Sequence, residues 1–194
     1  MLKRAFDILI SLVLLVIFSP FLILISIAIK VDSSGEVIFR QERVGRFGQI
    51  FRIHKFRSMK KNSSMQLTLG ESDNRITRVG KFVRKLHLDE LLQLIDVLSG
   101  NMSLVGPRPE VPEFTKYYKD KWKKVLSIRP GITGYGTLKT VDFEYKALSK
   151  SKDPKQDYIK IILPKKLDLE IEYLKKQSFV FDLKLMLLTL KRFF

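Results

Sequence analysis

The sequence predicts an α+β protein, mainly helical, with an N-terminal segment that enters a membrane. Three observations predict this class. An apolar run of 22 residues without a charge extends from Ile8 to Ile29. Two short β-type runs follow it around Gly45 and Gly48, and helical patterns occupy much of the remainder. We therefore expect a membrane helix, one small β-hairpin, and amphipathic helices that lie at the membrane interface.

Composition limits the possible functions. The chain has 194 residues, of which 45% are hydrophobic, which is enough for one core with appendages. Its 36 Lys and Arg against 20 Asp and Glu give a net charge of +16, which favours a nucleic acid, an anionic membrane face or a phosphorylated substrate. There are no cysteines, so disulfides, thiolate metal sites and a cysteine nucleophile are excluded. Two histidines disfavour a zinc site, and a metal here would be a hard, oxygen-bound ion such as Mg²⁺.

The apolar run is long enough to span a bilayer. As a straight helix it would measure about 33 Å, against a hydrocarbon core of roughly 30 Å. It is longer than the apolar region of a cleaved signal peptide, and no small-x-small cleavage site follows it. Pro20 interrupts the run and clashes with the carbonyl of Val16, so we expect a bend there, with Ser19 bonding to the freed carbonyl.

Both flanks of the run are basic, with Lys3 and Arg4 before it and Lys30 and Arg40 after it. The positive-inside tendency therefore draws both ends toward the cytoplasm. A re-entrant helix-break-helix of about half the bilayer depth satisfies this tendency. A kinked single-pass anchor is also compatible, because proline is common in membrane helices, and these residues alone leave both arrangements open.

The segment after the run, VIFRQERVGRFGQIFRIHKF, predicts the β-hairpin. If residues 49–58 are extended, Lys55 and Arg57 share one face and Arg52 and His54 share the other. His54 is expected to be a satisfied or surface histidine. Residues 60–74 are polar and predict a loop.

The stretch LHLDELLQL places two adjacent acids, Asp89 and Glu90, inside an apolar run. Leucines and isoleucine at helical spacing predict a helix that ends at Gly100. On one helix the two acids point about 100° apart, so each meets different surroundings. The flank that holds Asp89 is polar, whereas desolvation is expected to favour the protonated form of Glu90, beside Leu86, Leu94 and Val97. Two such carboxylates can take different chemical roles; the alternative is a pair of solvated helix charges.

Further along, SLVGPRPE holds Arg108 between two prolines that stiffen the loop. This suits an arginine directed at a phosphate, because the planar guanidinium can bind two oxygens. The following RPGITGYG allows close approach of the backbone to a ligand, and ordinary turn chemistry explains it equally well.

Two segments in the second half of the chain suggest a membrane surface. FTKYYKDKWKKVL mixes aromatics with lysines, as at a membrane interface or an RNA-binding surface. Residues 179–194 are too short to span a bilayer and predict an interfacial or core-docked helix.

The motifs occur in a familiar order. KRAFDI, the Ser-Pro break, VIFRQERVGRFG, FRIHKFRSM, RITRVGKFVRK, LDELLQL, GNMSLVGPRPE and RPGITG together resemble the bacterial sugar transferase family, the monotopic phosphoglycosyl transferases. The resemblance runs from Lys3 to about Thr189, and in size the chain looks like the small members that consist of the catalytic core alone.

The resemblance implies an enzyme that transfers a phospho-sugar from a UDP-sugar to a polyprenol (undecaprenyl) phosphate and releases UMP. It implies Mg²⁺ as cofactor and the cytoplasmic face of the bacterial inner membrane as location. Such a reaction is the first membrane step of a polysaccharide or glycoprotein pathway. Nucleic acid is not expected as a partner.

By motif, Asp89 matches the family's nucleophile, which forms an acyl-phosphate intermediate. Glu90 matches the neighbouring acid, associated with Mg²⁺ and with catalysis, so both acids are candidate metal ligands. Four basic residues match positions expected to bind substrate phosphate, namely Lys55, Arg57, Arg84 and Arg108. Ser19 and Pro20 match the break of a re-entrant membrane helix, which now becomes the favoured arrangement.

These assignments predict three parts: a membrane hairpin at residues 1–31, a cytoplasmic catalytic domain at 32–178 and a C-terminal helix at 179–194. Chemistry agrees with them, because a carboxylate can attack an anionic diphosphate only when cations neutralise the phosphoryl oxygens. The hypothesis from another class is a membrane-tethered, basic polyanion-binding protein without catalysis, in which Asp89 would be dispensable.

Overall fold

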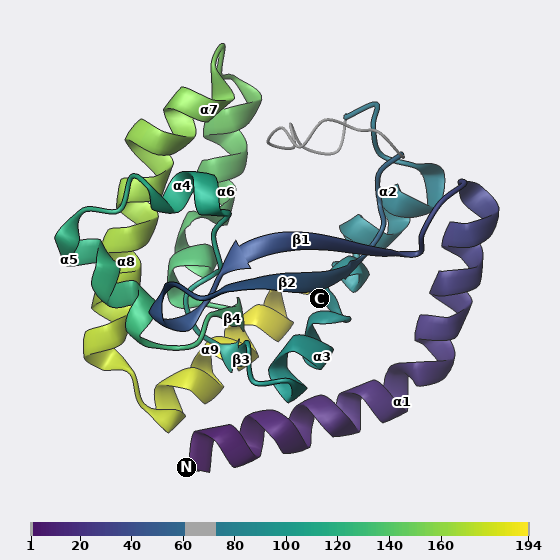
Figure 1. Cartoon of the computed structure of the whole chain (residues 1–194), viewed down its shortest axis with the longest axis horizontal. Coiled ribbons are helices and arrows are strands. Elements are labelled where there is room, and N and C mark those ends of the chain that lie inside the picture. The colour runs from purple at the N-terminus through teal and green to yellow at the C-terminus, as the bar shows by residue number, and fades with distance from the viewer. Residues whose placement is uncertain (1, 61–72, 194) are drawn as a thin grey trace. The chain divides into compact units, whose positions relative to one another are not determined.

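The computed structural model describes residues 2–60 and 73–193, and it confirms a mainly helical α+β chain with small sheets (Figure 1). Most of the loop predicted at 60–74 lies outside the described residues. The elements are α1 Leu2–Asp32, β1 Ile38–Val44, η1 Arg46–Gly48, β2 Ile50–Phe56, α2 Arg78–Lys85, η2 Leu88–Glu90, α3 Gln93–Leu98, β3 Ser103–Val105, α4 Pro112–Thr115, α5 Asp120–Lys123, η3 Lys124–Ser127, β4 Gly131–Thr133, α6 Tyr135–Ser149, α7 Pro154–Asp157, the π-helix η4 Tyr158–Ile162, α8 Leu163–Lys176 and α9 Phe179–Phe193.

The chain forms two compact units. The first unit comprises Met1–Gln41 and Arg52–Ser99, and the second comprises Glu42–Phe51 and Gly100–Phe194. The hairpin of β1 and β2, predicted from the sequence and confirmed here, contributes residues to both units. The predicted division at residues 31 and 178 stays a prediction.

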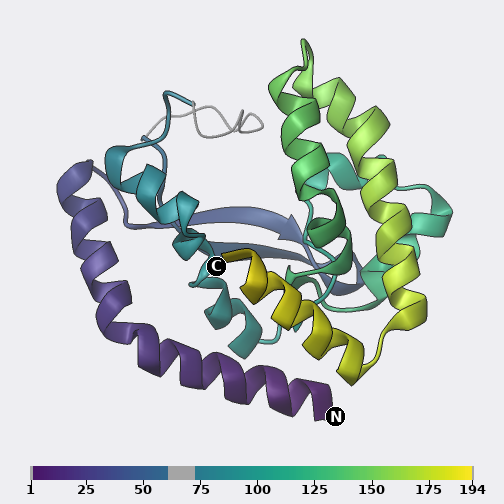
Figure 2. The ribbon, with the colours of Figure 1, turned by 180° about the vertical axis from the view of Figure 1, so that it is seen from behind.

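Helix α1 is continuous but bent, as Figures 1 and 2 show from opposite sides (Figure 1, Figure 2). Pro20 lies inside it, and Ser19 Oγ donates a hydrogen bond of 2.8 Å to the carbonyl of Val16, as predicted. Apolar side chains line its exposed surface, among them Val16, Ile17 and Leu24. By length and composition α1 could cross a membrane.

Both ends of α1 are fastened within the first unit. Near the start, the Arg4 guanidinium donates to the carbonyls of Val97, at 2.7 Å, and Leu98, at the C-terminus of α3. Beyond the other end, Arg57 Nη2 donates to the Ser33 carbonyl at 2.7 Å. A cation at a helix C-terminus satisfies carbonyls that lack partners and complements the helix dipole.

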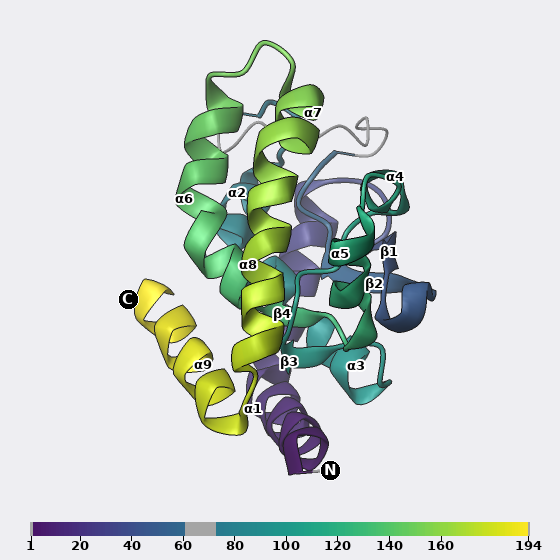
Figure 3. The same cartoon turned by 90° about the vertical axis from the view of Figure 1, so that its left-hand side faces the viewer.

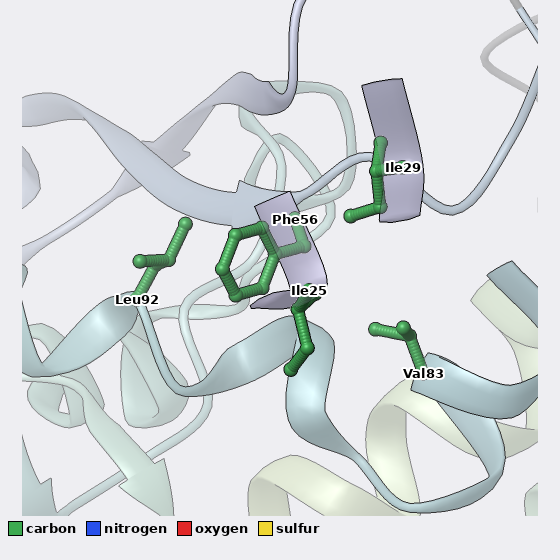
Figure 4. Packing of buried hydrophobic residues seen from close by; sticks show 5 residues of the cluster. All are labelled: Ile25, Ile29, Phe56, Val83 and Leu92. Carbon is green, nitrogen blue, oxygen red and sulfur yellow. The ribbon is translucent and has the colours of Figure 1, made fainter. Parts of the chain in front are cut away.

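A small apolar core holds the C-terminal half of α1. Ile25 and Ile29 pack with Phe56 of β2, Val83 of α2 and Leu92, which immediately precedes α3 (Figure 4). Full burial of each such side chain contributes about 1.5–3 kcal/mol. This core therefore fixes α1, β2 and the segment around Asp89 to one another.

The prediction of one helix through Asp89 is wrong. Helix α2 ends at Lys85, His87 adopts a left-handed conformation with φ 51°, and a single 3-10 turn, η2, precedes α3. The leucine periodicity persists across the break because the short pieces share one core, so periodicity alone could not reveal it. The predicted end was correct, since Gly100 follows α3 with φ 89°, the left-handed position that favours glycine.

In the second unit, β3 and β4 form a parallel pair with Ser103 opposite Gly131 and Val105 opposite Thr133. Helices α6 and α8 run side by side (Figure 3). The C-terminal helix α9 docks on β3 and β4, with Leu185 buried and Thr189 Oγ1 2.6 Å from Thr133 Oγ1.

The aromatic and lysine segment is largely core in this unit. Phe114, Tyr118 and Trp122 are buried, and the Trp122 indole N–H donates to Asp168 at 2.7 Å. Three of its aromatics are therefore used for packing, which leaves them unavailable to stack on RNA bases.

Candidate active site

The acidic pair lies on the short turn η2, between the left-handed His87 and helix α3. The break in the helix frees Asp89 and Glu90 from the regular 100° spacing that one helix would impose. Packing of Leu92 against Ile25 and Phe56 anchors the segment directly after the pair.

Glu90 forms an ion pair with Lys55. Lys55 Nζ lies 2.7 Å from Glu90 Oε1, and the two side chains are only 15% and 17% exposed. The burial of both partners distinguishes this pair from surface ion pairs, which solvent weakens. The structure thus joins two of the predicted site residues from distant parts of the chain.

Asp89 has an unusual electrostatic environment. Burial raises the pKa of its carboxyl group, and the neighbouring Glu90 charge raises it further. The positive charges of Lys55, Arg84 and His87 act in the opposite direction and lower the pKa. The expected desolvation of Glu90 stays a prediction, and the structure adds a desolvation effect on Asp89 that the sequence argument did not foresee.

His54 is a satisfied histidine, as expected. Its ring Nδ1 lies 2.8 Å from Asp96 Oδ1, and its main-chain N–H donates to Asp96 Oδ2 at 2.9 Å. Asp96 is 1% exposed, so these contacts compensate for its desolvation. The pair fastens β2 to α3 and thereby supports Lys55, the next residue on β2.

Arg57 also acts within the first unit. It is buried, and its Nη2 donates to the carbonyls of Ile29 and Ser33 and to Ser33 Oγ. These contacts join the end of α1 to β2. The predicted role of Arg57 in binding substrate phosphate stays a prediction.

Arg108 lies in the second unit, in a loop that follows β3. Its neighbours are held by main-chain contacts. Gly131 N–H donates to the Pro107 carbonyl at 2.9 Å, and Arg43 Nη1 donates to the Pro109 carbonyl at 3.0 Å. Because the carboxyl ends of adjacent parallel strands meet at one edge, this loop lies beside the start of α6, which follows β4.

Behind this loop lies a buried polar cluster formed by Glu110, Tyr158 and Lys166. The Tyr158 hydroxyl donates to Glu110, and Lys166 Nζ lies 3.3 Å from the same carboxylate. The charge of Lys166 and the hydrogen bond from Tyr158 hold the pKa of Glu110 below its usual value despite burial. Tyr158 belongs to the π-helix η4, whose wider turn changes which side chains share a face with α8.

The glycines of RPGITGYG serve close packing between loops. A Cβ on Gly131 would lie 2.1 Å from the Gly106 nitrogen, and a Cβ on Gly136 would lie 2.4 Å from Glu170 Oε1. The sequence left open whether these glycines admit a ligand or form turns. The structure favours contacts within the chain.

The acidic pair has the chemistry of a magnesium site. Among the described residues there is no group of three or more His, Cys, Asp or Glu side chains that could hold a metal ion. Mg²⁺ does not require one, because it is commonly held by one or two carboxylates together with substrate phosphate and water. The adjacent carboxylates of Asp89 and Glu90 fit that pattern, since a cation there would offset the repulsion that raises the pKa of Asp89.

Sequence reasoning missed several residues of the two units. His87 acts on Asp89 by its charge, and its position two residues before the acid was the available signal. Glu110 follows the Pro-Arg-Pro motif directly. Lys166 and Glu170 were not recognised, because each is influenced by a residue far away in the sequence, Glu110 for Lys166 and Gly136 for Glu170.

Comparison with known proteins identifies the family of this chain. Residues 1–194 match the family model described as bacterial sugar transferase. The chain therefore belongs to the bacterial sugar transferase family.

Curated relatives are similar over most of this chain. It is 37% identical over 194 residues to the UDP-glucose:undecaprenyl-phosphate glucose-1-phosphate transferase of Escherichia coli. This alignment covers 97% of this chain and 39% of that protein. It is 42% identical over 141 residues to the UDP-N-acetylgalactosamine-undecaprenyl-phosphate N-acetylgalactosaminephosphotransferase of Aeromonas hydrophila, covering 70% of this chain and 33% of that protein. It is 31% identical over 191 residues to an uncharacterised sugar transferase, EpsL, of Bacillus subtilis. This alignment covers 98% of this chain and 86% of that protein.

The chain thus spans well under half the length of the first two relatives and most of the third. The names of the first two specify different donor sugars and the same lipid phosphate acceptor.

Proposed function

We propose that this protein transfers a phospho-sugar from a UDP-sugar to a polyprenol phosphate, with undecaprenyl phosphate as the acceptor class, and releases UMP. One observation carries the proposal. Asp89 is a desolvated carboxylate beside Glu90, which is paired at 2.7 Å with Lys55, in a member of the bacterial sugar transferase family. The names of the Escherichia coli and Aeromonas relatives support the choice of donor and acceptor classes.

The first step uses Asp89 as a nucleophile. A carboxylate oxygen attacks the phosphorus bonded to the sugar, forming an oxygen–phosphorus bond to Asp89. The bond between this phosphorus and the oxygen bridging to the second phosphate breaks, and that oxygen leaves with UMP. Desolvation favours the attack, because a poorly solvated carboxylate reacts more readily than a hydrated one.

The second step regenerates the enzyme. An oxygen of the polyprenol phosphate attacks the same phosphorus, and the bond to Asp89 breaks. The products are polyprenol-diphosphate-sugar and the free Asp89 carboxylate. Two steps at one nucleophile allow a soluble donor and a membrane-bound acceptor to use the site in turn.

Positive charge makes both steps feasible. Lys55 and Arg84 already lower the pKa of Asp89, so their charges reach the place where the phosphoryl group must sit. Arg108 suits phosphate recognition by its bidentate fork. Mg²⁺, held by Glu90 and Asp89, would neutralise phosphoryl oxygens during the transfer.

We further propose that α1 enters the membrane as a re-entrant helix and returns to the face it left. Pro20 and the bonded Ser19 accommodate the bend, and the fastening of Arg4 to α3 and of Ser33 to Arg57 supports ends on one side. If α1 were straight, its 31 residues would hold its two ends about 46 Å apart, which is more than the thickness of the hydrocarbon core, roughly 30 Å. The basic flanks then favour the cytoplasmic face of the bacterial inner membrane.

The topology can be tested with tags at Met1 and Phe194 in intact cells. We expect both to be shielded from a membrane-impermeant reagent and both to react after permeabilisation. Labelling of the Met1 tag alone in intact cells would show a single-pass anchor instead.

The activity is tested by incubating purified full-length protein with Mg²⁺ and a panel of UDP-sugars, without lipid. We expect release of about one equivalent of UMP and a mass increase of one phospho-sugar on Asp89, as for a covalent intermediate that accumulates. Asp89→Asn should abolish both. Asp120→Asn, which alters a 95% exposed carboxylate in the second unit, should abolish neither.

Two other hypotheses give different results in the same assay. One is direct attack by the lipid phosphate, with Asp89 only holding Mg²⁺, and the other is polyanion binding without catalysis. Lipid-dependent turnover without an adduct would indicate direct attack by the lipid phosphate. No UMP release and no adduct with any donor, together with binding that weakens steeply with salt, would favour a basic polyanion-binding protein.

A further inference from the structure

Strand β2 is joined to the segment that carries the acidic pair at two successive residues. His54 contacts Asp96 of α3, and Lys55 contacts Glu90 of η2. All four residues belong to the first unit. The proposed chemistry uses Lys55 and Glu90 and gives no role to the other two. The contact between His54 and Asp96 is therefore a polar interaction directly beside the site that the chemistry leaves unused.

Asp96 is a carboxylate in an unfavourable position. Its side chain is 1% exposed, and burial raises the pKa of its carboxyl group. Both of its oxygens meet one residue: the main-chain N–H of His54 donates to Oδ2 at 2.9 Å, and the ring Nδ1 lies 2.8 Å from Oδ1. An ionised carboxylate only accepts hydrogen bonds, so the ring presents Nδ1–H to it. The buried acid thus holds both the backbone and the side chain of His54.

The consequence for Lys55 follows from the geometry of the strand. The main-chain contact at His54 lies one peptide away from Lys55, and consecutive Cα atoms are only about 3.8 Å apart. Lys55 Nζ reaches Glu90 Oε1, at 2.7 Å, through a flexible four-carbon stem that loses conformational entropy when it is held. A fixed backbone at the base of the stem reduces this loss, so the ion pair stays formed in a larger fraction of molecules.

Apolar packing alone does not supply this precision. Phe56, the next residue of β2, lies in the same core as Leu92, which stands between Glu90 and Asp96 in the sequence (Figure 4). Hydrophobic contacts are non-directional, whereas a hydrogen bond requires a short distance and an aligned donor. The core therefore brings β2 to the segment, and the polar contacts at Asp96 fix how the strand lies on it.

We propose that His54 and Asp96 form a positioning pair: by binding the backbone and the ring of His54 to α3, they keep the Lys55 ammonium on Glu90, beside the proposed nucleophile. This inference rests on the proposed function. It assigns no contact between His54 and substrate, and it predicts that the effect of His54 on the reaction passes through Lys55.

The test compares substitutions on β2 in the purified full-length protein. His54→Phe keeps a ring and removes the nitrogen donor. His54→Asn restores a donor, because its amide nitrogen is bonded to Cγ as Nδ1 is in histidine. Ile53→Val is the matched control for general loosening of the strand, since it alters a neighbouring residue that is 2% exposed without touching the polar pair.

The first measurement follows the ion pair directly. An amine-reactive reagent is applied without Mg²⁺ or donor, and mass spectrometry gives the labelling of Lys55 relative to Lys81, an exposed lysine of α2. We expect His54→Phe to raise this ratio about 5-fold, because labelling follows the fraction of molecules in which the ion pair is open. His54→Asn and Ile53→Val should keep the ratio within about 2-fold of the wild type, because neither removes the contact to Asp96.

The second measurement is the single-turnover rate of UMP release from a donor that the wild type accepts. His54→Phe should slow it about 10-fold, as for a small misplacement of a charged group, and His54→Asn should restore it to within about 3-fold. In a Lys55→Met background, His54→Phe should change the rate by less than about 2-fold, because residues that act through one another are not additive.

Equal labelling of Lys55 in His54→Phe and wild type would overturn the proposal. Equal slowing by His54→Phe in both backgrounds, or an effect of Ile53→Val as large as that of His54→Phe, would leave His54 a purely structural residue. If His54→Phe does not fold, His54→Gln, whose amide lies one bond further from the main chain, replaces it in the comparison with His54→Asn. Absence of UMP release by the wild type refutes the proposed function, whereas the labelling of Lys55 still tests the positioning pair.

Discussion

Glu170 is a buried side chain of α8, and its replacement by glutamine gives a quantitative prediction about stability. The pKa of Glu170 is raised from 4.5 to about 7, chiefly by burial and against the opposing charge of Lys166. Between these values the folded protein holds a proton that the unfolded chain releases, so stability must fall as pH rises. At about 1.4 kcal/mol per pKa unit, the loss between pH 5 and pH 8 amounts to about 2.5 kcal/mol. The glutamine variant has no group to titrate there and does not suffer this loss.

The assay is thermal unfolding followed by fluorescence of Trp122, the single tryptophan, which is buried in the same unit as Glu170. For a chain of this size, about 2.5 kcal/mol corresponds to roughly 5–10 °C. The Tm of Glu170→Gln minus the Tm of the wild type should therefore increase by that amount from pH 5 to pH 8. Any effect of the substitution that does not depend on pH cancels in this comparison. Glu172→Gln makes the same chemical change at a side chain of α8 that is 40% exposed, and it should follow the slope of the wild type. Parallel curves for Glu170→Gln and wild type would refute the reasoning.

Three further predictions concern the acidic pair and the loops. Glu90→Gln removes a charge that raises the pKa of Asp89, so the acidic limb of single-turnover UMP release should move to lower pH. Lys55→Met removes a charge that lowers this pKa, so the limb should move to higher pH, and Lys85→Met, at an exposed position, should leave it in place. Gly131→Ala should destabilise the second unit by about 3 kcal/mol, because its Cβ would meet the Gly106 nitrogen at 2.1 Å; Trp122 fluorescence measures this loss.

Opposite shifts for the two variants at Asp89 are the critical result. If Glu90→Gln and Lys55→Met moved the acidic limb in the same direction, the electrostatic account of Asp89 would be wrong. A Tm for Gly131→Ala equal to that of the wild type would show that the strands can separate to admit a methyl group.

Several features could be predicted because they depend on neighbours in the sequence. The bend at Pro20 and its compensation by Ser19 follow from one missing N–H and one freed carbonyl. The hairpin around Gly45 and Gly48 follows from β-type runs on either side of turn residues. The phosphate-binding role that the two flanking prolines suggest for Arg108 stays a prediction.

The break at His87 could not be predicted. Left-handed conformation is usual for glycine and uncommon for any other residue, so a single histidine was too weak a signal to predict the break. The leucines around it keep a helical rhythm because the pieces on both sides pack into one core. Local pattern therefore indicated one helix where the backbone breaks, and of its apolar stripe Leu92 is buried whereas Ile95 is 40% exposed.

The sequence by itself determined the class of protein, the apolar membrane segment and the identity of the acids and cations that can carry the chemistry. These depend on composition, on short-range periodicity and on motifs read in order. Only the tertiary structure decided that Lys55 pairs with Glu90, that Asp89 is desolvated, and that the Glu170 side chain is buried. Such pairings join residues tens of positions apart, and only the packing of the core brings them within reach, since charge and burial act through space.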